Sequence, residues 1–389
     1  MKKILFSIMA LGLFISCQNE LYRDNAEIYK SEQGSYVSES NAQVFVKDGD
    51  SQDIRKIRLS LALKPERDIT VSVVAGDASV LADYNKKNGT NYELLPKEMY
   101  EAASSVTFPA QTSTVVYPVS LKKVKFKPGT VYALPVSLVG GNAIPGQRVG
   151  LIVVEPLTVT KVVRFNGSGS EDGKMWPEVL KVKQWTMEMM IRRSAYDRNN
   201  RALGGTKGNS NGSIDEIYTR FGDVVIDPDQ LQMKTASSNL NVPKDKLSAK
   251  PNEWYMLSFV YDGVYNKIYV NGNLAYSAIH RENNEYGLTG FWISGNNEYI
   301  REFRFYKVAK TEQQIANSTW KMADYDDPNL LVYYPMNGKK LDRESGNTVV
   351  EDETKIWDWS KNQKHLNLPS GAKFMNDANG QPFVFPLQK

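Results

Sequence analysis

Residues 253–277, EWYMLSFVYDGVYNKIYVNGNLAYS, decide the fold. In the first half of this stretch every second residue is apolar or aromatic: Tyr255, Leu257, Phe259, Tyr261. A period of two is typical of a half-buried β-strand. Asn271-Gly272 separates two further apolar runs, and because both residues adopt positive φ at little cost they favour a two-residue hairpin turn. The stretch therefore predicts consecutive antiparallel strands.

The same alternation recurs along the rest of the chain, at 57–63, 69–73, 115–121, 132–138 and 185–191. Short alternating runs separated by turn residues predict antiparallel sandwiches. Two helices interrupt them in this prediction. One spans 80–88, capped by Ser79 and ended by Gly89, and the other spans 312–320 after Thr311. The Gly-, Asn- and Ser-rich stretch 197–213 predicts a long exposed loop.

The N-terminus has the pattern of an export signal. Lys2 and Lys3 precede an apolar run that ends at Ser16-Cys17. The run is shorter than the roughly 20 residues needed to cross a bilayer. A charged start, a short apolar stretch and a small residue at the cut site indicate cleavage rather than a membrane span. An ordinary signal followed by a chance cysteine is the alternative.

Composition excludes several classes of site. Formal net charge is +4, reduced by two if the signal is removed, and no basic block occurs, so nucleic acid is not an expected partner. The chain has one cysteine and two histidines, which leaves no internal disulfide and disfavours a zinc site. Mean hydropathy of −0.45 leaves no room for further membrane spans.

Three stretches resemble known families. Phe14-Ile15-Ser16-Cys17 resembles the lipobox of bacterial lipoproteins, with Phe14 in place of the usual Leu. Residues 77–96 and 131–138 resemble an N-terminal domain of Bacteroidetes surface lipoproteins. WTMEMMIR (185–192), RFGD (220–223), EWYMLSFVYDGVYNKIYVNGNLAYS and EFRFYKVAKTEQQI (302–315) resemble the laminin-G/concanavalin A-like jelly roll. Segments 331–337 and 358–368 look like the opening of such domains, yet here they close the chain.

The resemblance implies an all-β protein, in which an immunoglobulin-like β-sandwich precedes a concanavalin A-like (laminin-G-type) jelly roll. The expected organisation is a signal peptide (1–16), a flexible tether from lipidated Cys17 (17–40), an immunoglobulin-like domain (41–158) and a lectin-like domain (159–389). It also implies an outer-membrane lipoprotein, on the cell surface or the periplasmic face. The implied partners are an oligosaccharide or polysaccharide, a glycan transporter and its companion lipoproteins.

No catalytic constellation is recognisable. Retaining glycosidases place two carboxylates about 5–5.5 Å apart, and the Glu-x-Asp-x-x-Glu string that often supplies them in this fold is absent. Glu188 lies within a predicted strand, where the family also has Glu in lectins without activity. His280 and His365 are expected as surface or loop residues. The prediction is therefore a non-enzyme; a glycoside hydrolase or lyase with dispersed acids, or a structural scaffold subunit, remain the alternatives.

Sugar recognition needs flat aromatic rings for the C–H faces of a pyranose and polar side chains for its hydroxyls. Aromatic residues in predicted loops or strand ends are the candidates, together with nearby polar groups: Trp176, Tyr196, Arg198, Tyr265, Tyr286, Trp292, Asn296, Tyr299. Each of these rings could equally be a core residue, because sandwiches bury many aromatics.

Calcium is the cofactor that the resemblance leaves open. Many lectin-like jelly rolls bind it through oxygen ligands. The candidate ligands are Asp223, Asp227 and Asp229, which lie close together between predicted strands. Asp-Pro-Asp is also an ordinary turn sequence, so both interpretations stand at this stage.

Overall fold

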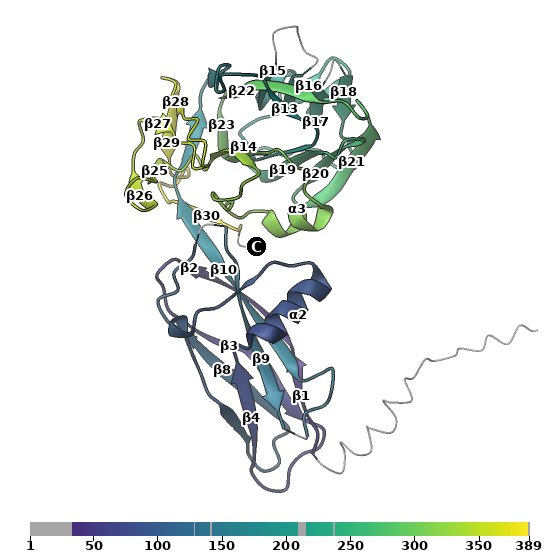
Figure 1. Cartoon of the computed structure of the whole chain (residues 1–389), viewed down its shortest axis with the longest axis vertical. Coiled ribbons are helices and arrows are strands. Elements are labelled where there is room, and N and C mark those ends of the chain that lie inside the picture. The colour runs from purple at the N-terminus through teal and green to yellow at the C-terminus, as the bar shows by residue number, and fades with distance from the viewer. Residues whose placement is uncertain (1–32, 128, 141, 209–214, 236–237, 388–389) are drawn as a thin grey trace, which may run out of the picture.

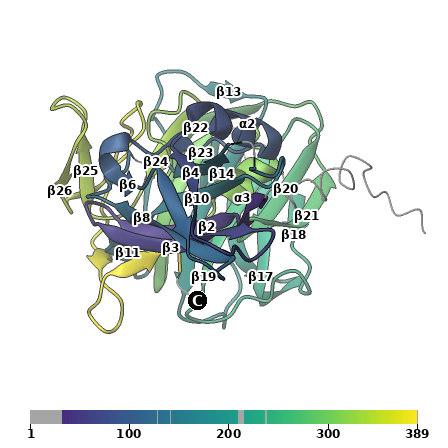
Figure 2. The ribbon, with the colours of Figure 1, turned by 90° about the horizontal axis from the view of Figure 1, so that it is seen from below.

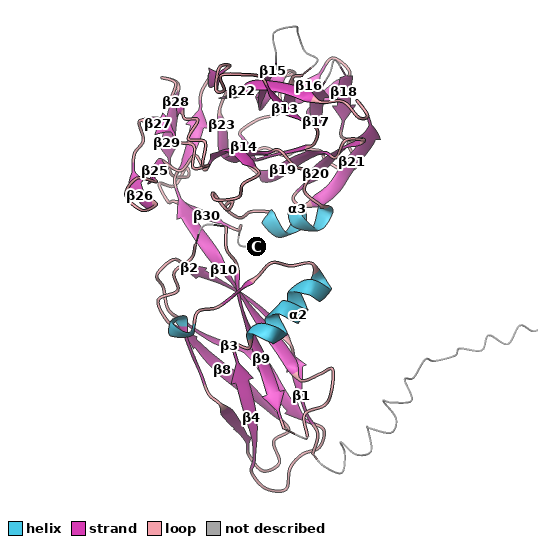
Figure 3. Cartoon of the chain, viewed as in Figure 1, coloured by secondary structure: helices cyan, strands magenta, loops and turns pink. Residues whose placement is uncertain are grey.

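The computed structural model describes residues 33–127, 129–140, 142–208, 215–235 and 238–387, and Cys17 lies outside them. The protein is all-β, as expected, with two sandwich domains stacked end to end (Figure 1) and few helices (Figure 3). Seen from below, the strands of the N-terminal domain lie over the C-terminal domain (Figure 2). Within the described residues no helix is long and apolar enough to cross a membrane.

The N-terminal domain packs a four-stranded sheet (order β1-β3-β8-β6) against a second sheet of order β2-β10-β9-β4-β7. Alternating side chains such as Ile57, Leu59, Val119 and Leu134 fill the space between them. Its elements are β1 (Ser35–Glu39), β2 (Asn41–Lys47), β3 (Gln52–Leu61), β4 (Ile69–Ala75), α2 (Ala78–Asn88), β5 (Glu93–Leu94), η1 (Lys97–Met99), β6 (Tyr100–Ala102), β7 (Ser105–Phe108), β8 (Thr114–Leu121), β9 (Tyr132–Val139) and β10 (Val149–Thr160).

The first elements differ from the sequence-based expectation in two details. β1 lies within the stretch expected to be tether, because its residues pair in register with β3 and bury Val37. Helix α2 begins two residues earlier than expected. Asp77, not Ser79, is its N-cap and accepts from the backbone N–H groups of Ser79 and Val80. Gly89 ends the helix at φ 60°, as expected.

The C-terminal domain is a jelly-roll-like sandwich of two larger sheets. The first has the order β21-β20-β19-β14-β23-β11-β29, with β24 beside β23, and the second has the order β12-β22-β15-β16-β17-β18, with β13 beside β22. Its strands in the first half are β11 (Val162–Phe165), β12 (Ser168–Asp172), β13 (Leu180–Val182), β14 (Trp185–Arg193), β15 (Arg201–Gly208), β16 (Ile217–Asp223), β17 (Ile226–Thr235) and β18 (Ser238–Asn241).

The second half begins with the stretch that decided the fold, and its Asn271-Gly272 hairpin is confirmed by φ values of 51° and 82°. The helix after Thr311 is also confirmed, with a complete capping box to Gln314. The elements are β19 (Trp254–Tyr261), β20 (Tyr265–Val270), β21 (Asn273–Ile279), β22 (Tyr286–Gly295), β23 (Glu298–Tyr306), α3 (Glu312–Ser318), β24 (Leu330–Tyr334), β25 (Lys339–Asp342), β26 (Thr348–Glu351), β27 (Lys355–Ile356), β28 (Leu366–Asn367), β29 (Ala372–Met375) and β30 (Phe383–Phe385).

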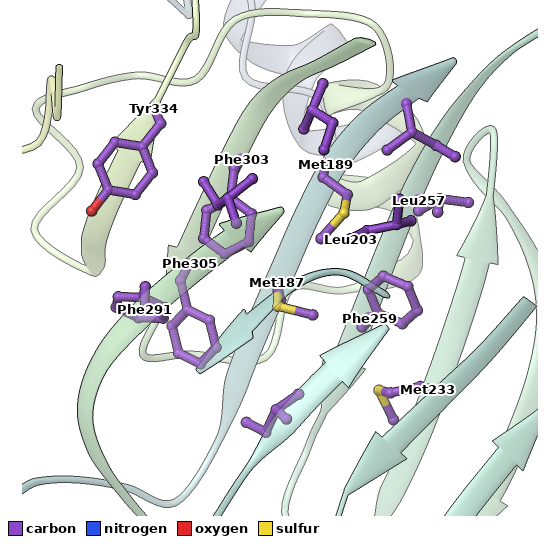
Figure 4. Close-up of a cluster of buried hydrophobic side chains, with 14 of the residues drawn as sticks. Met187, Met189, Leu203, Met233, Leu257, Phe259, Phe291, Phe303, Phe305 and Tyr334 are labelled. Carbon is purple, nitrogen blue, oxygen red and sulfur yellow. The ribbon is translucent and has the colours of Figure 1, made fainter. Parts of the chain in front are cut away.

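Methionine and aromatic side chains form the core between these two sheets (Figure 4). Met187 and Met189 of β14 face Leu203 of β15 and Met233 of β17, with Phe291 and Phe305 beside them. Their flexible thioethers suit the irregular gaps between large rings. The core fixes which face of each strand points inward, and therefore which side chains are left on the outside.

The two domains are joined through one continuous strand. β10 pairs with β2 and β9 in the N-terminal domain, and its last residues, Thr158–Thr160, pair with β30 at the end of the chain. Phe383 and Phe385 of β30 pack against Trp254 with ring centroids 5.5 and 5.1 Å away. Glu155 of β10 also forms an ion pair with Lys321 at 3.2 Å. The C-terminal strand therefore ties the lectin-like domain to the strand that enters it.

Candidate functional site

The two sheets of the C-terminal domain differ in what covers their outer faces. The outer face of the β14-containing sheet is covered: Ile315 of α3 packs on Val260 and Tyr269, and Phe383 and Phe385 pack on Met190. The other sheet, which contains β22, β15, β16 and β17, lies at the end of the molecule away from the N-terminal domain (Figure 1). Its outer face is the open one.

A row of paired residues crosses six strands on this open face. Strand register places its members side by side, in the order Glu171, Trp292, Gly205, Tyr218, Lys234, Asn239. Their neighbours along the strands, such as Phe291 and Ile293, point into the core. Because side chains alternate between the faces of a strand, the row must point outward.

Trp292 and Tyr218 form an aromatic pair at the centre of this row. Their ring centroids are 6.0 Å apart with an interplanar angle of 53°. Gly205 lies between them in the sheet, and a Cβ there would come within 2.1 Å of the Ile217 carbonyl and 2.7 Å of the Tyr218 Cβ. Only glycine leaves room for the two rings to approach each other over the backbone. Both rings are partly exposed, and neither belongs to a hydrophobic cluster of the described residues.

Charged side chains flank the pair. Lys234 Nζ and the Arg220 guanidinium lie 5.7 and 5.8 Å from the Tyr218 ring centroid. On the side of Trp292, Glu171 forms an ion pair with Lys207 at 2.5 Å. Such groups can donate to or accept from hydroxyls, so the apolar rings have polar groups on both sides.

A hydrogen-bonded network lies next to the pair, two residues further along the strands. Arg220 donates to Gln232 Oε1 at 2.7 Å and also to Asp223, while Gln232 donates to Asn241 Oδ1 at 2.7 Å. Burial alone would raise the pKa of Asp223. Hydrogen bonds from the Val224 N–H and from Gln232, together with the positive charge of Arg220, have the larger effect and hold the pKa below its usual value. Its carboxylate therefore acts as an acceptor that orders the network.

A pocket of about 380 Å³ adjoins the same face. Gly169, Ala202 and Ser294 line it, and Ser294 is two residues from Trp292 on the same side of β22. Arg201 and Asn296 line it as well. With its amide oxygen turned toward Arg201, Asn296 accepts from both terminal guanidinium nitrogens, at 2.8 and 3.3 Å.

Glu298 lies at the base of this pocket and is only 2% exposed. It forms an ion pair with Arg193 at 3.0 Å and accepts from the backbone N–H of Asn296. Burial raises the pKa of Glu298 in spite of the Arg193 charge. The group is held by protein partners and lies beneath the pocket surface.

The structure brings two of the predicted sugar-binding residues together. Trp292 belongs to the aromatic pair and Asn296 to the adjoining pocket. Arg198 lies exposed in the loop that leads to Asn200, another residue of the pocket lining. Tyr265 is 42% exposed, but it lies on β20 of the other sheet.

The prediction is wrong for Tyr286, and three other rings pack onto protein rather than stand free. Tyr286 is fully buried against Trp185 and donates to or accepts from Thr235, because β22 turns it into the core. Three half-buried rings pack on buried aromatic side chains. These are Trp176 on Phe291, Tyr196 on Phe221, and Tyr299 between Trp254 and Phe383.

The three aspartates considered for calcium do not converge. Asp223 pairs with Arg220, whereas Asp227 and Asp229 face Lys244 at 2.6 and 3.6 Å. Within the part of the chain that the structure describes, no group of three or more His, Cys, Asp or Glu side chains could hold a metal ion.

Glu188 is structural in this fold. It is fully buried and forms an ion pair with Arg304 at 2.8 Å, on the covered sheet. His365 lies in a loop, as expected, and is partly buried there: it accepts from the backbone N–H of Asp358 and packs edge-on against Trp357, with ring centroids 4.7 Å apart.

Sequence reasoning missed Tyr218, Arg201 and most of the polar network. Arg201 was missed because the 197–213 stretch looked like a loop, whereas it contains β15 in the middle of the open sheet. Its glycines are there for close strand approach rather than for flexibility. Tyr218 and most of the network lie on β16, β17 and β18, which were not predicted as strands. The sequence did contain a pattern that predicts β16: apolar Ile217 and Phe221 alternate with polar or amphipathic Tyr218 and Arg220.

Family models match both halves of the chain. Residues 22–145 match the model of an N-terminal domain family, and residues 168–316 match the concanavalin A-like lectin/glucanases superfamily. Together with the sandwich topology, this match decides the assignment. The C-terminal domain belongs to the concanavalin A-like superfamily. No curated protein sequence matches the chain.

One solved structure shares this fold over most of the chain, and others are similar to parts of it. A Bacteroides ovatus protein with a suggested role in carbohydrate binding is 21% identical, with a TM-score of 0.55 over 90% of this chain and 99% of its own. The SAP-like pentraxin of Limulus polyphemus is 14% identical, with a TM-score of 0.32 over 41% of this chain and 81% of its own. EndoBT-3987 of Bacteroides thetaiotamicron is 18% identical, with a TM-score of 0.27 over 31% and 30%. The first shows that the two-domain arrangement occurs elsewhere.

Proposed function

We propose that the protein binds a glycan on the open face of its concanavalin A-like domain and does not cleave it. The observation that carries the proposal is the Trp292–Tyr218 pair, two partly exposed rings held side by side over Gly205. The C–H face of a pyranose is flat and apolar, and a ring that is already held in place loses little entropy when a sugar stacks on it.

The polar residues around the aromatic pair can form hydrogen bonds with the hydroxyl groups of a sugar. Lys234 lies next to Tyr218 in the row and Asn239 lies next to Lys234, and the network of Arg220, Gln232 and Asn241 lies two residues further along the strands. Sugar hydroxyls donate and accept, so they need both kinds of partner. The superfamily match and the suggested carbohydrate-binding role of the Bacteroides ovatus protein support the same function.

The nearby carboxylates favour binding over hydrolysis, because each of them is already paired with a basic side chain. Glu171 is paired with Lys207 and Asp223 with Arg220. Glu298, whose raised pKa would suit a general acid, is buried beneath the pocket and bonded to Arg193. A glycosidase needs an acid and a second carboxylate that reach the same glycosidic bond.

The proposal includes a lipid anchor at Cys17 and a position on the outer membrane, beside a glycan transporter and its companion lipoproteins. The open sheet lies at the end of the molecule opposite the N-terminal domain (Figure 1), which suits a protein tethered through its N-terminus. Labelling with radioactive palmitate, lost in Cys17→Ala, tests the anchor. Protease treatment of intact cells distinguishes the cell surface from the periplasmic face.

Glycan arrays with the mature chain test the binding, followed by titration calorimetry on each ligand found. Trp292→Ala and Tyr218→Ala are expected to weaken binding about fivefold or more, since stacking of a nucleobase on one aromatic side chain contributes on the order of 1–3 kcal/mol. Tyr265→Ala is the matched control, because it removes an exposed ring from the other sheet. Equal affinity in all variants, or no binding to plant, host and microbial glycans, would contradict the proposal. Sugar release from a bound glycan would favour an enzyme.

A further inference from the structure

The pocket beside the aromatic pair carries an excess of positive charge. Arg201 lines it and has no carboxylate within 4.0 Å among the residues that the structure describes. Behind it lies Arg193, 1% exposed, which has one carboxylate partner among the described residues, Glu298. Two guanidinium groups therefore face one carboxylate, so the site keeps one uncompensated positive charge.

The Arg201 guanidinium is held ready for a ligand. Asn296 accepts from its two terminal nitrogens with a single oxygen, which fixes the plane of the group. A guanidinium has five N–H donors, so others stay available. A planar, fixed fork of donors matches the two oxygens of a carboxylate or a sulfate better than it matches a hydroxyl.

Unpaired polar atoms surround the same place. Ser168 belongs to the pocket lining, but its hydroxyl is buried behind the pocket wall, near Gly371, and has no hydrogen-bond partner. Behind the pocket, Arg193 Nη1 and the Tyr196 hydroxyl are also buried without a partner. Buried donors of this kind cost free energy unless something accepts from them. An anionic group and the water it brings into the pocket would supply acceptors.

The volume and position of the pocket fit one sugar unit. At about 380 Å³ it lies within the range of roughly 300–1,000 Å³ that is usual for small-molecule sites. Ser294 joins it to Trp292 on the same face of β22. A glycan stacked on the aromatic pair can therefore extend its next unit into the pocket.

We infer that the glycan is acidic, and that the pocket binds a carboxylate or sulfate group of one sugar unit through Arg201. This inference rests on the proposed glycan binding and names the ligand class of the same face. The anionic group accepts from Arg201, and the neighbouring unit of the chain stacks on Trp292 and Tyr218.

The experiment compares matched ligands. Oligosaccharides of galacturonate, glucuronate, N-acetylneuraminate and sulfated sugars are titrated into the mature chain beside their carboxyl-reduced or desulfated counterparts. Wild type is expected to bind an acidic member at least tenfold more tightly than its uncharged counterpart, and only the acidic ligand is expected to weaken as salt rises. Uronate and sulfate arms show which anion is preferred.

Three variants complete the test. Arg201→Met is expected to lose that preference, with a much larger loss of affinity for the acidic ligand than for its uncharged counterpart, and Arg201→Lys to keep part of it, because lysine has the charge without the fork. Arg55→Met is the control, since it removes the same charge from an exposed site on β3. Thermal unfolding checks that each variant is folded.

The outcomes separate this inference from the proposed function. If Trp292→Ala abolishes binding but acidic and uncharged ligands bind wild type alike, the charge inference fails and glycan binding stands. If Arg201→Met keeps the acidic preference, the inference fails as well. If no glycan binds at all, both fail.

Discussion

Glu188→Gln tests whether Glu188 is a structural residue of the covered sheet or a functional acid. Glu188 and Arg304 are both fully buried, and the Glu188 carboxylate accepts from Arg304 Nε at 2.8 Å and from the Ser258 hydroxyl at 3.0 Å. Lys310 lies 3.5 Å away. Glutamine keeps the shape of the side chain but leaves the Arg304 charge without its closest partner.

The expected loss of folding free energy is large. Removing one member of a buried ion pair costs about 3–5 kcal/mol, because the remaining charge stays buried without compensation. Glu302 lies 3.6 Å from Arg304 and offsets part of this cost, so we expect the lower end of that range. Urea unfolding, followed by tryptophan fluorescence and by circular dichroism, measures it.

The matched control is Glu39→Gln. Glu39 pairs with Arg58 at 3.1 Å, but both side chains are about half exposed. Exposed pairs contribute about 0–1 kcal/mol. If Glu188→Gln lost no more free energy of unfolding than Glu39→Gln, the structural interpretation of the buried network would be wrong. If it unfolded normally and also lost glycan affinity or cleavage, Glu188 would be functional.

The pH dependence gives a second readout of the same network. Burial alone would raise the pKa of Glu188, but Arg304, Lys310 and Ser258 together lower it below its usual value. The folded state therefore releases the proton more readily than the unfolded state. The stabilisation is present above the pKa of the unfolded chain and is lost as pH falls through the lower folded-state pKa. Glu188→Gln is expected to flatten this part of the stability curve.

Three further predictions concern the domain junction, metal dependence and the partly buried His365. Phe385→Ala is expected to cost about 3–5 kcal/mol, as for other buried phenylalanines, and to increase proteolysis at the junction, since Phe385 is fully buried against Trp254. EDTA is expected to leave glycan affinity unchanged in calorimetry. Asp227, one of the calcium candidates, forms an ion pair with Lys244, whose charge takes the place of a metal ion. Burial and nearby lysines lower the pKa of His365 to about 4. Between this value and the unfolded value near 6.5 the unfolded chain binds more protons, so stability rises with pH there. NMR titration of His365 checks the pKa, and a midpoint near 6.5 would contradict it.

Sequence patterns predicted the fold well because sandwiches are built on local alternation. The Asn271-Gly272 turn and the Thr311 cap depend on a few adjacent residues, and both are confirmed. The site was harder to predict because burial of a ring is decided across strands. Tyr286 and Trp292 lie six residues apart on the same strand, yet one is in the core and the other on the outside. An unbroken period of two would place both side chains on the same face of β22. The pairing of β22 with β15 is irregular at Lys207/Gly208, so the buried face changes between the two residues.

The unequal covering of the two sheets is the physical reason to look for function on only one of them. The β14 sheet buries charged side chains such as Arg304 on its outer side, and it can do so because α3 and the C-terminal segments cover them and supply partners, among them the Ser318 and Lys321 carbonyls. Among the described residues the open sheet has no such cover, and yet it keeps Trp292 and Tyr218 together on its outer side, where both rings are partly exposed. Rings that stay partly exposed contribute less to folding than rings buried in a core, since they remove less apolar area from water. Their placement over Gly205, beside an ordered polar network, is better explained by a ligand that binds on this face and covers the two rings.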